Sequence, residues 1–98
     1  MRRAIALATL LLCSCAITFE GIERALDRAL PVSGGVDCAD AERLRDDLCD
    51  LSRRTCVRSD AAKDDAQLAA QCADGRQRCE RARVRVEERC VRGMVDER

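Results

Sequence analysis

The residues of this chain with the most capacity for chemistry are its eight cysteines, in a sequence of 98 residues. Thiols can join in disulfides, hold a metal ion or act as redox nucleophiles. Zinc sites and thioredoxin-like redox sites are usually marked by His residues or by C-x-x-C pairs. The sequence contains no His, and residues 17–98 contain no C-x-x-C pair. We therefore expect no metal and no cofactor, and we expect disulfide bonds.

Six of the cysteines follow one another at gaps that read the same in both directions. The gaps hold 10, 6, 15, 6 and 10 residues. Steps of 11 and 7 residues rotate an α-helix by about 20° past three turns and about 20° short of two. The first three cysteines therefore share a stripe of one helix, and the last three share a stripe of another. The six residues are Cys38, Cys49, Cys56, Cys72, Cys79 and Cys90.

The rise of a helix excludes any bridge between two cysteines of the same stripe. Seven residues climb about 10.5 Å, whereas a disulfide needs Cα atoms within about 7 Å. Parallel helices would misalign the middle bridge by about 6 Å, whereas antiparallel helices align all three. The alternative is a loop-rich knot with unrelated connectivity. The predicted disulfides are Cys38–Cys90, Cys49–Cys79 and Cys56–Cys72.

The two helices that carry the cysteines have recognisable ends. The segment 30–37 holds the only Pro and a Gly pair, and Asp37 at its end is a suitable N-cap for the first helix. The matched register places the bend near residue 64, where Asp64 and Gln67 resemble a capping box. A rival bend at residues 59–60 would skew the bridges.

The second helix is predicted to run from residue 65 to residue 92 and to end at Gly93. Gly75 lies inside it, where glycine costs about 1 kcal/mol relative to alanine. A need for small size beside a disulfide explains its presence.

A shorter amphipathic helix is predicted before the Gly/Pro segment. Its apolar residues recur at steps of three and four. We expect this helix to dock on an apolar flank of the first long helix; a mobile tether and contact with a partner are the alternatives. The apolar residues are Phe19, Ile22, Leu26 and Leu30, and the flank is Leu44, Leu48 and Leu51.

The chain is therefore predicted to be an all-α protein, a disulfide-stapled antiparallel helical hairpin with an additional short N-terminal helix. The hairpin occupies residues 37–93, the short helix and linker occupy residues 17–36, and residues 94–98 form a tail.

Residues 1–16 have the form of a secretory signal peptide. Arg2 and Arg3 precede an apolar run from Ala4 to Leu12, which is too short to span a bilayer. A general signal peptidase would cut after Ala16, because small residues occupy the required positions.

A second route is indicated by the sequence Leu12-Cys13-Ser14-Cys15, which resembles the lipobox of bacterial lipoproteins. In that family the last cysteine becomes diacylated and forms the new N-terminus. The resemblance implies cleavage before Cys15, lipidation of Cys15 and, since Ala16 follows, the outer membrane.

Charge is balanced overall, with 18 basic and 18 acidic residues, but it is divided along the chain. Residues 37–65 hold nine acids against six bases, and residues 76–92 hold seven Arg against three Glu. We interpret this as an Arg-rich helix facing an acidic one, and expect no nucleic acid, because no aromatic side chain is placed to stack bases. The register sets Arg45 opposite Arg83. We expect the two side chains to separate and to turn toward Glu42, Glu80 or Glu87.

These features predict no enzyme, since no nucleophile and base occur at a telling spacing. We expect a small non-enzymatic cell-envelope (lipo)protein that acts as a structural or protein-interaction module, with an envelope protein as partner and no small-molecule substrate. It would lie on the periplasmic face of the outer membrane if lipidated, and otherwise be periplasmic or secreted.

Two alternatives remain open. The first is a secreted disulfide-rich inhibitor or toxin-like peptide, because the layout resembles plant hairpinin peptides, although their two C-x-x-x-C motifs are absent. Arg58 or Lys63 at the bend would then enter a trypsin-like S1 pocket. The second is a subunit of a larger assembly that buries the first amphipathic helix.

Overall fold

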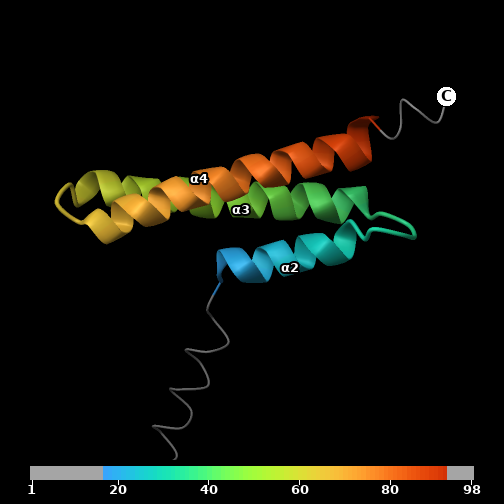
Figure 1. The fold of residues 1–98 in the computed structure, drawn as a ribbon, viewed down its shortest axis with the longest axis horizontal. Helices are drawn as coiled ribbons and strands as arrows, with labels where there is room; N and C mark the ends of the chain where they lie inside the picture. The colour runs from blue at the N-terminus through green and yellow to red at the C-terminus, as the bar shows by residue number, and fades with distance from the viewer. Residues whose placement is uncertain (1–16, 93–98) are drawn as a thin grey trace, which may run out of the picture.

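The computed structural model describes residues 17–92, which form helices joined by two short connections and contain no β-strand. The two long helices run antiparallel side by side, and the short helix lies along them at their open end (Figure 1). This is the predicted all-α hairpin with an extra helix. The elements are α2 (Phe19–Ala29), α3 (Cys38–Ala61), α4 (Ala66–Val86) and the π-helix η1 (Glu87–Arg92).

Three disulfides join α3 to the α4–η1 segment, and we call them the rungs. Their Cα–Cα distances are 5.7, 4.8 and 4.6 Å from the open end to the bend, which lie in the range that disulfides adopt. They are the three pairs predicted from the spacing. Disulfides persist in oxidising compartments, so the rungs indicate an extracellular or periplasmic location. The pairs are Cys38–Cys90, Cys49–Cys79 and Cys56–Cys72.

The start of α3 agrees with the sequence analysis, whereas the start of α4 differs by one residue. Asp37 caps α3, where its carboxylate accepts from Asp40 N at 3.0 Å. The α4 cap is Asp65, which accepts from Leu68 N at 3.1 Å, so the predicted Asp64 cap is wrong. The reason is a tight turn: Asp65 N donates to Ala62 O at 2.9 Å, which leaves Asp64 inside the turn.

The sequence predicted that the second long helix would stay α-helical to residue 92. In the structure it changes to a π-helix at Glu87. Cys90 lies within this π-helix, is 3% exposed and forms the outer rung with Cys38.

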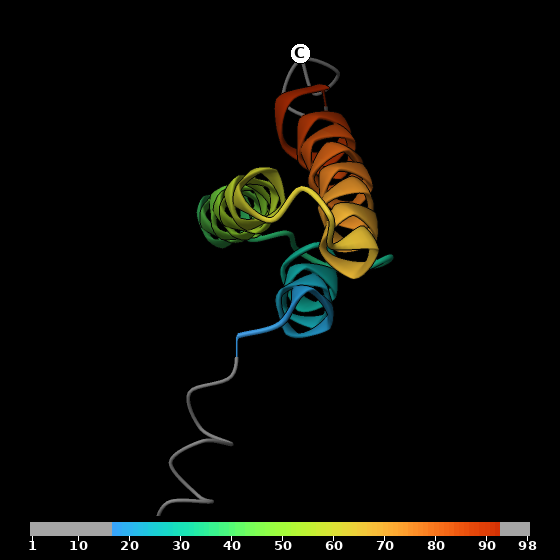
Figure 2. The same ribbon diagram turned by 90° about the vertical axis from the view of Figure 1, so that its left-hand side faces the viewer.

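The short helix α2 docks on the hairpin, as predicted. Thr18 caps it by accepting from Gly21 N at 3.0 Å. The helix lies beside both α3 and α4 (Figure 2), and its apolar residues join theirs in one core. At the centre, Leu26, Leu48 and Val86 are at most 1% exposed. The buried core is Ile22, Leu26, Ala29, Leu30, Ala41, Leu44, Leu48, Ala82, Val86 and Cys90.

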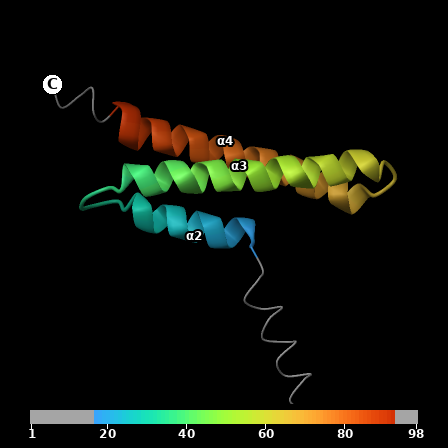
Figure 3. The ribbon, with the colours of Figure 1, turned by 180° about the vertical axis from the view of Figure 1, so that it is seen from behind.

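The helix α2 covers only part of the hairpin, as the view from behind shows (Figure 3). With 11 residues it is about 16 Å long, against about 36 Å for the 24 residues of α3. The apolar stripe of α3 ends at Leu51, and Thr55 takes the next position toward the bend. Toward the bend, the buried positions of α3 are Ser52, Thr55 and Cys56, so the buried apolar stripe does not continue beyond the reach of α2.

Candidate functional site

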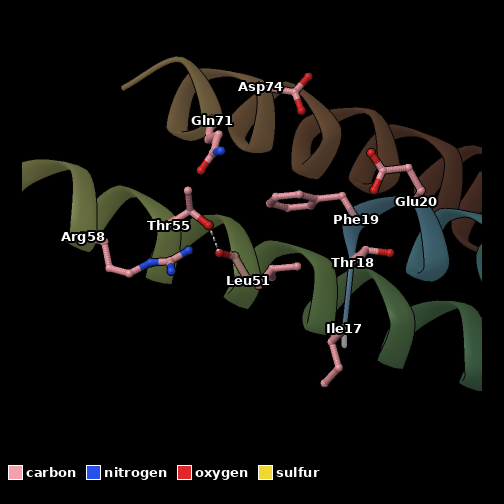
Figure 4. Close-up of a pocket in the computed structure, with 9 residues that line it drawn as sticks. All are labelled: Ile17, Thr18, Phe19, Glu20, Leu51, Thr55, Arg58, Gln71 and Asp74. Carbon is pink, nitrogen blue, oxygen red and sulfur yellow. Dashed lines mark hydrogen bonds between the residues drawn. The ribbon is translucent and has the colours of Figure 1, made fainter. Parts of the chain in front are cut away.

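A notch of about 320 Å³ lies where α2 begins, between α3 and α4. Phe19 points into it from α2, Gln71 from α4 and Thr55 from α3 (Figure 4). The hydroxyl of Thr55 donates to Leu51 O at 2.9 Å. The notch thus combines an apolar wall with a few polar groups, as binding sites commonly do. It is lined by Ile17, Thr18, Phe19, Glu20, Leu51, Thr55, Arg58, Gln71 and Asp74.

Gly75 allows Phe19 to enter the notch. A Cβ at this position would lie 2.9 Å from Phe19 Cζ and 3.2 Å from Ser52 Oγ, distances shorter than ordinary contacts between side chains. Small size beside a rung was the predicted role of this glycine. The structure adds that the missing Cβ also makes room for the aromatic ring.

Arg78 joins α2 to α4 beside the notch. Its side chain is 19% exposed, and it pairs with Asp74 on its own helix and with Glu20 and Glu23 on α2. The Nε–Oδ2 distance to Asp74 is 2.7 Å, and the guanidinium lies 5.7 Å from the centre of the Phe19 ring, within the range of a cation–π contact. One cation therefore fixes both the carboxylates and the aromatic ring at the start of α2.

The surroundings act on the pKa of Arg78 in opposite directions. Burial alone would lower this pKa, but the hydrogen bond to Asp74 and the charges of Glu23 and Asp74 outweigh burial and raise it above its usual value. Arg78 is therefore a permanent cation, and its one positive charge is shared among three carboxylates.

Further pairs between α2 and α4 continue toward the open end. Arg85 Nη1 lies 2.9 Å from Asp27 Oδ1, and Arg81 Nη2 lies 3.7 Å from Glu23 Oε2. The prediction that the Arg-rich helix faces the acids of α3 is wrong for these pairs. The physical reason is that α2 packs beside α4 and brings its own carboxylates within reach of these arginines.

The acids of α3 pair within that helix instead. Asp50 contacts both Arg53 and Arg54. The two arginines expected to face each other separate: Arg83 turns to Glu80 at 3.7 Å, as predicted, whereas Arg45 contacts the adjacent Asp46 at 3.0 Å and not Glu42. Pairs that are neighbours in sequence or one turn apart need little reorganisation.

Arg58 differs from the other charged residues of the notch. Within residues 17–92 its side chain makes no hydrogen bond or ion pair, whereas Asp74 and Glu20 both pair with Arg78. Arg58 is exposed, and its side chain lies beneath Thr55 in Figure 4. Arg58 is therefore the charged lining residue without an ion pair in the described part of the chain.

The two cations considered for a protease pocket occupy different places. Lys63 lies exposed in the turn between α3 and α4, as predicted. Arg58 lies in the last turn of α3, which continues to Ala61, so it stands just before the bend and not in the turn itself. The helix persists because its cap is formed by Ala62 N, which donates to Arg58 O and Ser59 O.

Some predictions lie outside the described residues, namely the signal peptide, the lipidation of Cys15, the helix end at Gly93 and the tail at residues 94–98. Between residues 17 and 92, no three His, Cys, Asp or Glu side chains are grouped so that they could hold a metal ion. Over the same residues, no helix has the length and apolar character needed to cross a membrane.

Comparison with known proteins returns no match to this chain among protein-family models, curated proteins or solved structures.

Proposed function

We propose that this chain is a non-enzymatic protein of the cell envelope that acts as a structural or protein-interaction module and is anchored by a lipid on Cys15. The observation that carries the proposal is the set of three rungs across one antiparallel hairpin. Such rungs belong to an oxidising compartment. They also hold the long helices in one relative position, which lowers the entropy lost when a partner binds.

The polar groups of the notch support a binding role more than a catalytic one. Thr55 is 3% exposed and its hydroxyl already donates to a backbone carbonyl. Arg58 and Gln71 supply charge and hydrogen bonds, and the carboxylates of Glu20 and Asp74 are engaged by Arg78.

The turn between the long helices favours the envelope module over a secreted protease inhibitor. Lys63 lies in a turn of residues 62–65 that is closed by a backbone hydrogen bond of 2.9 Å. A peptide that adds to the sheet edge of a partner is extended over several residues. A four-residue turn between helices offers no such stretch on either side of Lys63.

The proposal is tested by fractionating the cells that make the protein, after metabolic labelling with palmitate. We expect the chain in the envelope fraction, labelled, with all six mature cysteines resistant to alkylation. The matched control is Cys15→Ser, which should lose the label and leave the membrane fraction while its rungs remain oxidised. A cytoplasmic, unlabelled chain with alkylated cysteines would contradict the proposal.

A further inference from the structure

The notch at the start of α2 has an unusual distribution of charge. Three of its lining residues are charged, and the two carboxylates, Glu20 and Asp74, are both engaged by Arg78. The remaining charge is the exposed guanidinium of Arg58, which has no partner within residues 17–92. Arg58 is therefore the lining group that is available to pair with an anion.

The other lining groups restrict what can be attached to that anion. Phe19, Leu51 and Ile17 supply apolar surface, while Gln71 supplies an amide with both a donor and an acceptor. A volume of about 320 Å³ is at the lower end of the range for small-molecule sites. It suits one or two residues rather than a long chain.

We propose that this notch binds the carboxyl terminus of a partner polypeptide that ends in an apolar residue. The terminal carboxylate pairs with Arg58, whose planar guanidinium can donate two parallel hydrogen bonds to it. The last side chain packs on Phe19 and Leu51, and Gln71 accepts a hydrogen bond from the peptide N–H. The inference rests on the proposed interaction function and names the chemistry of the partner.

The amide of Gln71 favours a peptide over a fatty acid. Both ligands carry a carboxylate and apolar carbon, but only the peptide has an N–H that can use the acceptor of Gln71. Between the notch and the bend, no third helix covers α3 and α4 (Figure 1). The residues before the carboxyl terminus of the partner can therefore lie along this uncovered surface.

The test is a titration of the oxidised protein with N-acetyl-Ala-Ala-Leu, followed by ¹H–¹⁵N NMR. We expect shifts centred on Phe19, Leu51 and Gln71. The same peptide with a C-terminal amide should bind at least about tenfold more weakly, because the charge-assisted pair is lost. The substitution Arg58→Gln should lower the affinity for the free-acid peptide by a similar factor.

Arg76→Gln is the matched control, because Arg76 is an exposed arginine of α4 that does not line the notch. It should leave the affinity unchanged. Arg58 makes no ion pair that holds the fold, so its variant should keep the spectrum of the wild type outside the notch.

Four results would overturn the inference: equal binding of the amide, equal binding to Arg58→Gln, octanoate binding as tightly as the peptide, or no shift at about 10 mM peptide. None of these affects palmitate labelling or envelope fractionation. Failure of the predicted peptide binding at the notch is therefore distinguishable from failure of the proposed function.

Discussion

The outer rung, Cys38–Cys90, provides a quantitative test of how the ladder stabilises the hairpin. A disulfide stabilises mainly by limiting the unfolded chain, and its effect grows with the loop that it closes. The outer rung spans 52 residues and the inner rung, Cys56–Cys72, spans 16. Taken singly, these loops correspond to about 4.1 and about 3.1 kcal/mol in the chain-entropy account.

The rungs are nested, and this changes the expected difference. With the middle rung intact, the outer rung closes only the 11 residues from Cys38 to Cys49 and the 11 from Cys79 to Cys90. A loop of about 22 residues corresponds to about 3.4 kcal/mol. We therefore expect Cys38→Ala/Cys90→Ala and Cys56→Ala/Cys72→Ala to lose nearly equal stability, about 3 kcal/mol each.

The assay is guanidinium unfolding of both double variants and the wild type, followed by far-ultraviolet circular dichroism. The free energy of unfolding comes from linear extrapolation. If the outer variant loses at least about 1 kcal/mol more than the inner one, the nested-loop reasoning is wrong. Losses below about 1 kcal/mol in both variants would show that the ladder does not act through chain entropy.

Three further substitutions test the packing around α2 by the same measurement. Gly75→Leu should cost about 1–3 kcal/mol by overpacking, whereas Gly35→Leu, where a Cβ meets nothing within 4 Å, should change stability by less than about 0.5 kcal/mol. Leu48→Ala, at 0% exposure, should cost about 2–5 kcal/mol, against less than about 0.5 kcal/mol for Val57→Ala, at 62% exposure. Arg78→Ala should cost about 1–2 kcal/mol and make the free energy of unfolding less dependent on salt, because Glu20 and Glu23, two of its partners, lie on α2. A neutral Gly75→Leu or Leu48→Ala, or an Arg78→Ala with unchanged salt dependence, would contradict the packing described.

The sequence predicted the rungs because each residue of an α-helix adds a fixed rise along the helix axis. Matched steps of 11 and 7 residues leave one register that aligns three bridges. The caps were predictable to within one residue, since Asp64 and Asp65 are chemically equivalent and only the hydrogen bond that closes the turn separates them. The π-helix at Glu87–Arg92 was not predicted, because no feature of the local sequence pattern marks it.

The notch and the Arg78 cluster were missed because both depend on where α2 docks. A signal was present in α2, whose acids Glu20, Glu23 and Asp27 recur at steps of three and four beside the apolar stripe. That pattern is suited to a basic neighbour. The end of the apolar stripe at Leu51 likewise indicated how far a third helix could cover the hairpin. Neither signal alone identified α4 as the basic neighbour.

The most direct test of the central claim is a non-reducing peptide map of the native protein by mass spectrometry. Two antiparallel helices held at three heights predict three linked peptide pairs and no thiol open to alkylation among the six cysteines. A peptide that joins Cys38 to any residue other than Cys90, or a free thiol at any of the six positions, would contradict it.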